Sequence, residues 1–215
     1  MVSRRQLLGM SIGGVTLLSG CADFVTGSGP LSVEASPATV PSNTLADTGY
    51  EVDREEAQTL REEFAAAGQT REVEATNQLA IYYKQFEVPD VGETETGVFA
   101  AVATPAVEIA GQEFNPVAEL DHRELIEMFT EQYGEVSNLE QRGTETYTIL
   151  GESVTASLFT AEAVMEGQSV DIRGQIAVMR NADDFIISAA VSPERIHEQA
   201  ESSTPQLFES IEHAH

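Results

Sequence analysis

Two groups of side chains near the C-terminus have types and spacing that could bind a cation. His213 and His215 lie beside Glu209 and Glu212, and histidine and carboxylate are common metal ligands. Chain ends are usually poorly ordered, so a frayed tail explains the same residues. We prefer the frayed tail and predict no metal ion there.

A second group, Asn181, Asp183 and Asp184, lies between two apolar segments. Their oxygen atoms suit a hard cation, but these residue types also form hairpin turns. We expect a turn. The remaining candidate, His122, lies in the first turn of a predicted helix, and we expect it on the surface.

The sequence has none of the short motifs that mark common catalytic sites. It lacks a G-x-S-x-G nucleophile turn, a phosphate-binding loop, an H-E-x-x-H zinc motif and an EF-hand loop. Tyr82, Tyr83 and Phe129 could form an aromatic face for a ligand, although alternating burial in a strand also explains the two tyrosines. We predict no catalytic residues, no cofactor and no bound metal, and we expect that the protein is not an enzyme.

The N-terminal residues have the pattern of an export signal. Arg4 and Arg5 precede a mildly apolar run over residues 7–18, which resembles a twin-arginine signal. As a helix, residues 7–20 would span about 21 Å, which is short of the roughly 30 Å hydrocarbon core of a bilayer. We therefore predict a cleaved signal peptide over residues 1–20 rather than a membrane-spanning anchor.

The end of this segment predicts a lipid anchor. Leu18, Ser19 and Gly20 precede Cys21, the only cysteine of the chain, and this order resembles a lipobox. Cleavage before Cys21 would leave a residue whose sulfur carries lipid, and two acyl chains hold a protein on a membrane stably. We predict that the protein is exported and anchored by lipid to the outer face of the cell membrane.

The strong acidic excess predicts the salt in which the chain works. The chain has 36 acidic and 11 basic residues, which gives a net charge of −25. Such a chain repels itself in dilute buffer, but molar salt shortens the Debye length to about 3 Å and screens the repulsion. We expect a halophilic protein without a nucleic-acid partner, because nucleic-acid binding needs a basic surface.

After the signal we expect a lipidated spacer over residues 21–30 and a single domain over residues 31–213. The first part of the domain is ambiguous. Asp53 could cap a helix that ends at Gly68, or residues 53–67 could form one strand of a hairpin that turns there. The pattern of side chains leaves both structures open.

Later segments give clearer signals. Asp121 and Glu124 have the spacing of a capping box at the start of a helix. From Tyr147 to Val191 the apolar residues alternate, which predicts a four-stranded antiparallel meander, and short helices follow it. We predict an α+β fold, in which an antiparallel sheet with this C-terminal meander has one central helix and C-terminal helices packed on one face.

Several segments together resemble a known family. They are FAAAGQTREVEATNQLAIYYK, FNPVAEL, LGESVTASLFTAEAV and ESIEH, and they are similar to segments of a family of haloarchaeal exported lipoproteins of unknown function. The resemblance implies that residues 53–67 belong to a hairpin, and it supplies no catalytic residues. The order of helix, meander and terminal helix is also loosely similar to the PsbP-like fold, a likeness that says little about function.

Two functions fit these observations. The first is a non-enzymatic surface lipoprotein whose acidic domain meets envelope proteins as partners, which the anchor and the missing catalytic motifs favour. The alternative is a lipoprotein that binds a small molecule or a cation on the face that carries Tyr82, Tyr83 and Phe129.

Overall fold

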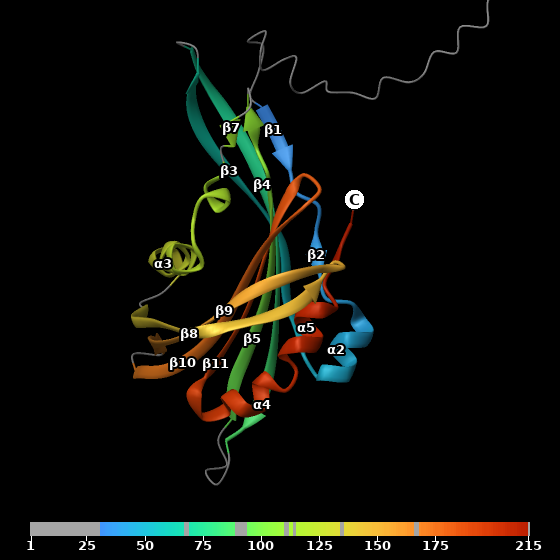
Figure 1. The fold of residues 1–215 in the computed structure, drawn as a ribbon, viewed down its shortest axis with the longest axis vertical. Coiled ribbons are helices and arrows are strands. Elements are labelled where there is room, and N and C mark those ends of the chain that lie inside the picture. Colours follow the sequence, from blue (N-terminus) through green and yellow to red (C-terminus); the bar gives the residue numbers. More distant parts are fainter. Residues whose placement is uncertain are drawn as a thin grey trace, which may run out of the picture.

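The computed structural model of the protein is shown in Figure 1. The structure describes residues 31–66, 69–88, 94–109, 112–113, 115–133, 136–165 and 168–214. Of these, 64% lie in strands and 21% in helices. The predicted α+β class is therefore wrong: the described part of the chain is mostly β, and short helices cover one large sheet.

In the described residues, eight strands form one mixed sheet. Its hydrogen-bonded order is β1-β4-β5-β11-β10-β9-β8, and β3 pairs with the other edge of β4. Only β1 runs parallel to its described neighbour. The strands are β1 (Leu31–Glu34), β3 (Glu51–Ala66), β4 (Gln69–Glu87), β5 (Thr94–Pro105), β8 (Val136–Ile149), β9 (Glu152–Met165), β10 (Gln168–Asn181) and β11 (Asp184–Pro193).

The remaining elements are short. Two small antiparallel pairs join β2 (Ala38–Thr39) to β12 (Glu212–His213) and β6 (Glu108–Ile109) to β7 (Gln112–Glu113). The helices are α2 (Ser42–Thr48), η1 (Pro116–Ala118), α3 (His122–Tyr133), η2 (Glu194–Ile196), α4 (His197–Glu201) and α5 (Thr204–Glu209). None of these described helices has the length and apolar character needed to cross a membrane.

The ambiguous segment is a strand as far as Ala66. Strand β3 pairs along its length with β4, and its side chains contact those across the ladder. Thr59 Oγ1 lies 2.9 Å from Thr76 Oγ1, and Arg61 Nε donates to Glu74 Oε1 at 2.6 Å. Cross-strand contacts of this kind offset the helix propensity of residues 54–66, because propensity is weak beside tertiary pairing.

Strands β8 to β11 pair in chain order, each antiparallel to the next. The turn between β8 and β9 has Leu150 at φ 50° and Gly151 at φ 82°, the left-handed conformation at both central residues that tight hairpins favour. Strand β8 begins at Val136, well before the alternating segment at Tyr147. The alternation of apolar residues does not reveal its first half, because the side chains there are mostly polar and exposed.

The two faces of the sheet carry different helices. Two consecutive residues of β11 point to opposite faces. Ile186 belongs to the core under α2, α4 and α5, whereas Ile187 belongs to the core under α3. In Figure 1, α3 lies on one side of the sheet, and α2 and α5 lie on the other. The predicted placement of the helices on one face is wrong, because both faces of the central strands are apolar and each needs cover.

The start of α3 is set by a reciprocal cap. The backbone N–H of Glu124 donates to Asp121 Oδ1 at 2.9 Å, and the N–H of Asp121 donates to Glu124 Oε2 at 2.8 Å. The predicted capping box is therefore confirmed. Leu125 then turns its fully buried side chain toward the sheet and joins Phe159 and Ile176 in one cluster.

Candidate ligand-binding groove

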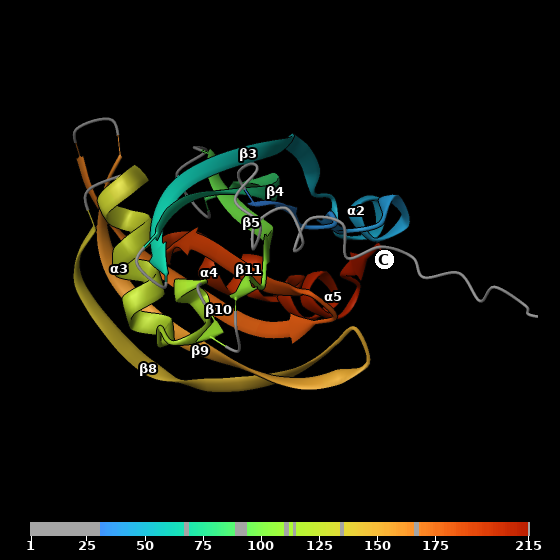
Figure 2. The same cartoon turned by 90° about the horizontal axis from the view of Figure 1, so that it is seen from above.

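A groove of about 830 Å³ lies between α3 and the sheet face that α3 covers. Figure 2 shows how the sheet curves from β3 and β4 around to β8 and β9, with α3 between its two ends. Apolar side chains from the sheet, η1 and α3 form its walls, and they include Leu79, Ile81, Val102, Phe159, Ile176, Ile187 and Ile126.

The groove has room because the middle of this face carries small residues. Ala100 on β5 is the register partner of Ala189 on β11, and both line the groove. Gly174 on β10 and Ala75 on β4 continue the same floor. A face that only had to bury α3 would be filled by larger side chains, since protein interiors are close-packed.

The lining is almost free of charge. In a chain of which 22% of residues are charged, Arg54 is the one ionisable residue among the described residues that line the groove. Leu60 is 50% exposed and Val191 is 36% exposed at its wall. Apolar side chains that stay in contact with water in a concave site favour the binding of an apolar molecule.

A polar band crosses this apolar surface. Gln58 on β3 and Asn77 on β4 are register partners, and both line the groove. The register of β4 with β5, continued by one residue, places Thr104 beside Asn77. Asn115, which also lines the groove, donates from Nδ2 to Thr104 Oγ1 at 2.9 Å.

The members of the band differ in how well they are satisfied. Asn115 Nδ2 also donates to the Pro105 carbonyl at 2.8 Å, and its Oδ1 accepts from the Val117 N–H at 3.0 Å. By contrast, Asn77 Oδ1 is a buried acceptor that has no hydrogen-bond partner among the described residues. A buried acceptor without a partner is unfavourable, so Asn77 is the least satisfied member of the band.

Residues 37–212 match the family model of a domain of unknown function, DUF6517. The chain belongs to the DUF6517 family. No curated protein matches the sequence. The match supports membership of a family of unknown function, and it shows neither a haloarchaeal origin nor a lipoprotein.

Two solved structures resemble this DUF6517 domain weakly. One is PA94, a protein of unknown function from Pseudomonas aeruginosa, with 12% identity and a TM-score of 0.36 over 68% of this chain and 92% of that one. The other is LpqN, involved in cell envelope biogenesis of Mycobacterium tuberculosis, with 8% identity and a TM-score of 0.36 over 81% and 98%. Likeness at this level carries no argument about function, and the PsbP-like resemblance is not shown.

The three predicted aromatic residues do not form one face in the DUF6517 domain. Tyr82 is fully buried on the side of α5, where its hydroxyl accepts from the Val40 N–H at 2.9 Å and burial raises its pKa. Tyr83 points the opposite way and donates to Glu51 Oε2 at 3.0 Å. Phe129 belongs to α3, whose Met128 lines the groove, but its side chain lies outside the described residues.

The two candidate cation-binding groups near the C-terminus, one with His213 and one with Asn181 and Asp184, lie in contact in the structure. The His213 ring is almost fully buried, with Nδ1 2.9 Å from Asn181 Oδ1 and Nε2 3.0 Å from Asp184 Oδ2. Asp184 also accepts from the Ser36 N–H at 2.9 Å. His213 is therefore not frayed: it ties β12 to the β10–β11 turn. The described residues include no group of three or more His, Cys, Asp or Glu arranged to hold a metal.

His122, the first residue of α3, is half-buried rather than fully on the surface as predicted, because its ring contacts β9. Its Nδ1 is 2.8 Å from Ser157 Oγ, and burial lowers its pKa. Asp183 is exposed in the turn. The export and lipidation residues, Arg4, Arg5 and the lipobox over residues 18–21, lie outside the described residues, and so does His215.

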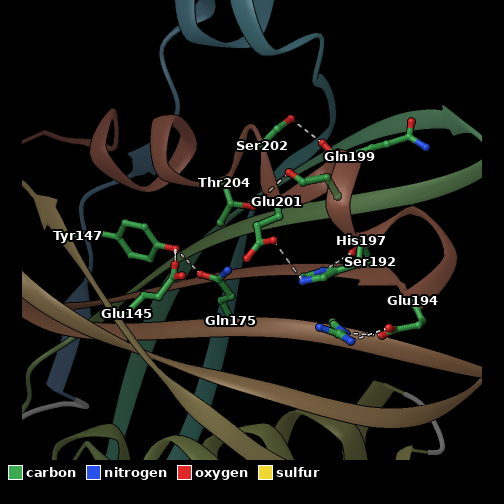
Figure 3. A network of polar contacts seen from close by, with 12 residues as sticks. Glu145, Tyr147, Gln175, Ser192, Glu194, His197, Gln199, Glu201, Ser202 and Thr204 are labelled. Carbon is green, nitrogen blue, oxygen red and sulfur yellow. Dashed lines mark hydrogen bonds and ion pairs between the residues drawn. The ribbon is translucent and has the colours of Figure 1, made fainter.

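A second polar cluster lies where β11 meets α4, on the face away from the groove (Figure 3). Ser192 Oγ is 3.4 Å from His197 Nδ1, and His197 Nε2 is 3.7 Å from Glu201 Oε2. The residue types suggest a nucleophile, a base and an acid. However, Ser192 is buried, both distances are long, and the adjoining cavity of about 10 Å³ holds about one water. The cluster therefore fits a structural role for α4.

Proposed function

We propose that this protein is an exported, lipid-anchored binding protein that holds an apolar small molecule in the groove under α3. The observation that carries the proposal is the groove itself, with its volume of about 830 Å³ and a single ionisable residue in its described lining. Ligand sites of proteins are commonly 300–1,000 Å³ clefts with apolar walls and a few placed polar groups. The proposed activity is binding without catalysis.

The anchor is part of the proposal. Arg4 and Arg5, followed by the lipobox that ends at Cys21, support export and attachment of lipid. Envelope proteins that deliver or accept the ligand would be the partners. A Cys21→Ala variant should lose retention in the membrane fraction, whereas a serine-to-alanine change at the exposed Ser202 should leave it unchanged. An unchanged membrane fraction for Cys21→Ala would remove the anchor from the proposal.

Binding is tested by titration of the full chain with Nile red, a neutral apolar dye, in molar potassium chloride. We expect dye fluorescence to saturate with the wild-type protein. Ala100→Phe and Ala189→Phe each place a ring on the groove floor, because the two residues are register partners at its centre. Each substitution should weaken dye binding at least tenfold.

The matched control is Val52→Phe, which adds the same ring to an exposed position of β3 that does not line the groove. It should bind dye as the wild type does. Circular dichroism of all variants verifies that they fold. Equal dye binding by Ala100→Phe, Ala189→Phe and the wild type would refute the groove as the site.

A further inference from the structure

We propose that the ligand of the groove is a neutral amphipathic molecule, with a long apolar body and a hydroxyl group that donates a hydrogen bond to Asn77. This inference rests on the proposed function and names the class of ligand. It follows from the polar band that crosses the groove and from the charge of the surroundings.

The need for a donor follows from Asn77. Its Oδ1 is a buried acceptor without a partner, although Asn77 lines a groove with room for a ligand. No donor of the band is paired with this oxygen, and the amide of Asn115 donates to Thr104 and Pro105 instead. A pure hydrocarbon would leave the acceptor unpartnered, whereas a ligand hydroxyl would satisfy it. Because Oδ1 itself is not exposed, Asn77 has to rotate about χ2, a soft torsion, for this oxygen to reach a ligand in the groove.

The need for neutrality follows from the charges. A ligand ammonium group would be buried with no described carboxylate in the lining to pair with it. A carboxylate or phosphate would place acceptor oxygens against the acceptor Oδ1 of Asn77. Arg54, the cation of the described lining, already lies 3.9 Å from the carboxylates of Asp53 and Glu56. A hydroxyl avoids both costs, because it donates a hydrogen bond without carrying charge.

The test compares matched competitors for Nile red on the full chain in molar potassium chloride. 1-Decanol carries the hydroxyl, 1-methoxydecane keeps the oxygen but cannot donate, and decanoate is an anion. The measured quantity is the ratio of the affinities for decanol and its methyl ether. In the Asn77→Leu variant this ratio should fall roughly tenfold relative to the wild type, as expected for one buried neutral hydrogen bond.

The control is Asn43→Leu, the same substitution at an exposed position of α2. It should leave the ratio unchanged. An equal ratio in wild type and Asn77→Leu would overturn the inference, and so would stronger displacement by decanoate than by decanol. Both outcomes leave the proposed function standing, whereas absence of Nile red binding to the wild type would refute that function itself.

Discussion

Phe208 should be among the most sensitive positions for stability, because it joins the C-terminal helices to the sheet. Its side chain is fully buried. The ring stacks on Tyr147 with centroids 4.7 Å apart and planes at 12°, and it meets Phe99 edge-on at 5.2 Å and 82°. Replacing it tests whether α5 unfolds together with the sheet.

The expected magnitude follows from burial and geometry. Phe208→Ala should lower the free energy of unfolding by about 3–5 kcal/mol, the range for deletion of a buried phenylalanine. The value should lie near the upper end, because each aromatic pair adds about 0.5–1.5 kcal/mol beyond its buried area. Phe208→Leu should be less severe, since leucine fills part of the cavity.

The assay is urea unfolding at constant molar potassium chloride, followed by circular dichroism and tyrosine fluorescence, because the chain has no tryptophan. Leu60→Ala is the control: its side chain is half exposed, and its removal should change stability by no more than about 0.5 kcal/mol. If Phe208→Ala cost no more than Leu60→Ala, α5 would not belong to the cooperative unit and the reasoning would fail.

Three further perturbations test other contacts. His213→Ala leaves the buried carboxylate of Asp184 without its ring partner and should lower the free energy of unfolding by about 1–3 kcal/mol; a midpoint equal to that of the wild type in urea would contradict the tie between β12 and the turn. Burial lowers the pKa of His122 from its ordinary 6.5, so the unfolded chain binds the proton first as pH falls. The contribution of His122 to the free energy of unfolding should be complete above about pH 6.5 and decrease below it. His122→Gln should reduce this pH dependence in urea titrations from pH 7 to 5. In roughly 0.1 M salt the chain should lose tertiary structure through unscreened repulsion, and near-ultraviolet circular dichroism that is unchanged from molar salt would refute its adaptation to salt.

Local signals in the sequence predicted local structure well. The capping box at Asp121 and Glu124 uses only neighbouring residues, so its pattern could be read directly. The alternating segments from Tyr147 onward could also be predicted as strands, because alternation is a pattern of neighbouring residues. Strand β3 could not be assigned in this way, because its side chains are mostly exposed and it is held by pairing with β4.

The predicted α+β class was wrong because long polar edge strands do not show the alternation of apolar residues by which strands are predicted. Strand β3 and the first half of β8 are solvent-exposed edges and carry little periodic signal. The groove was missed for a different reason. Its floor combines Ala75, Ala100, Gly174 and Ala189 from four strands, and small residues look unremarkable until the register places them side by side. A usable signal was present at Leu79, Ile81 and Tyr82, since apolar residues on both faces of one strand imply that both faces are covered.

The groove floor also makes a prediction about the balance between stability and function. Some apolar side chains of the groove wall stay exposed to water, such as Val191 at 36% exposure. A larger neighbouring side chain would bury them and stabilise the fold. If the space is kept for a ligand, filling it should stabilise the free protein while it removes binding. Ala189→Leu should therefore raise the free energy of unfolding by about 0.5–2 kcal/mol and weaken Nile red binding. Lower stability together with unchanged dye binding would mean that the alanines serve packing against α3, and the space would then have no role in recognition.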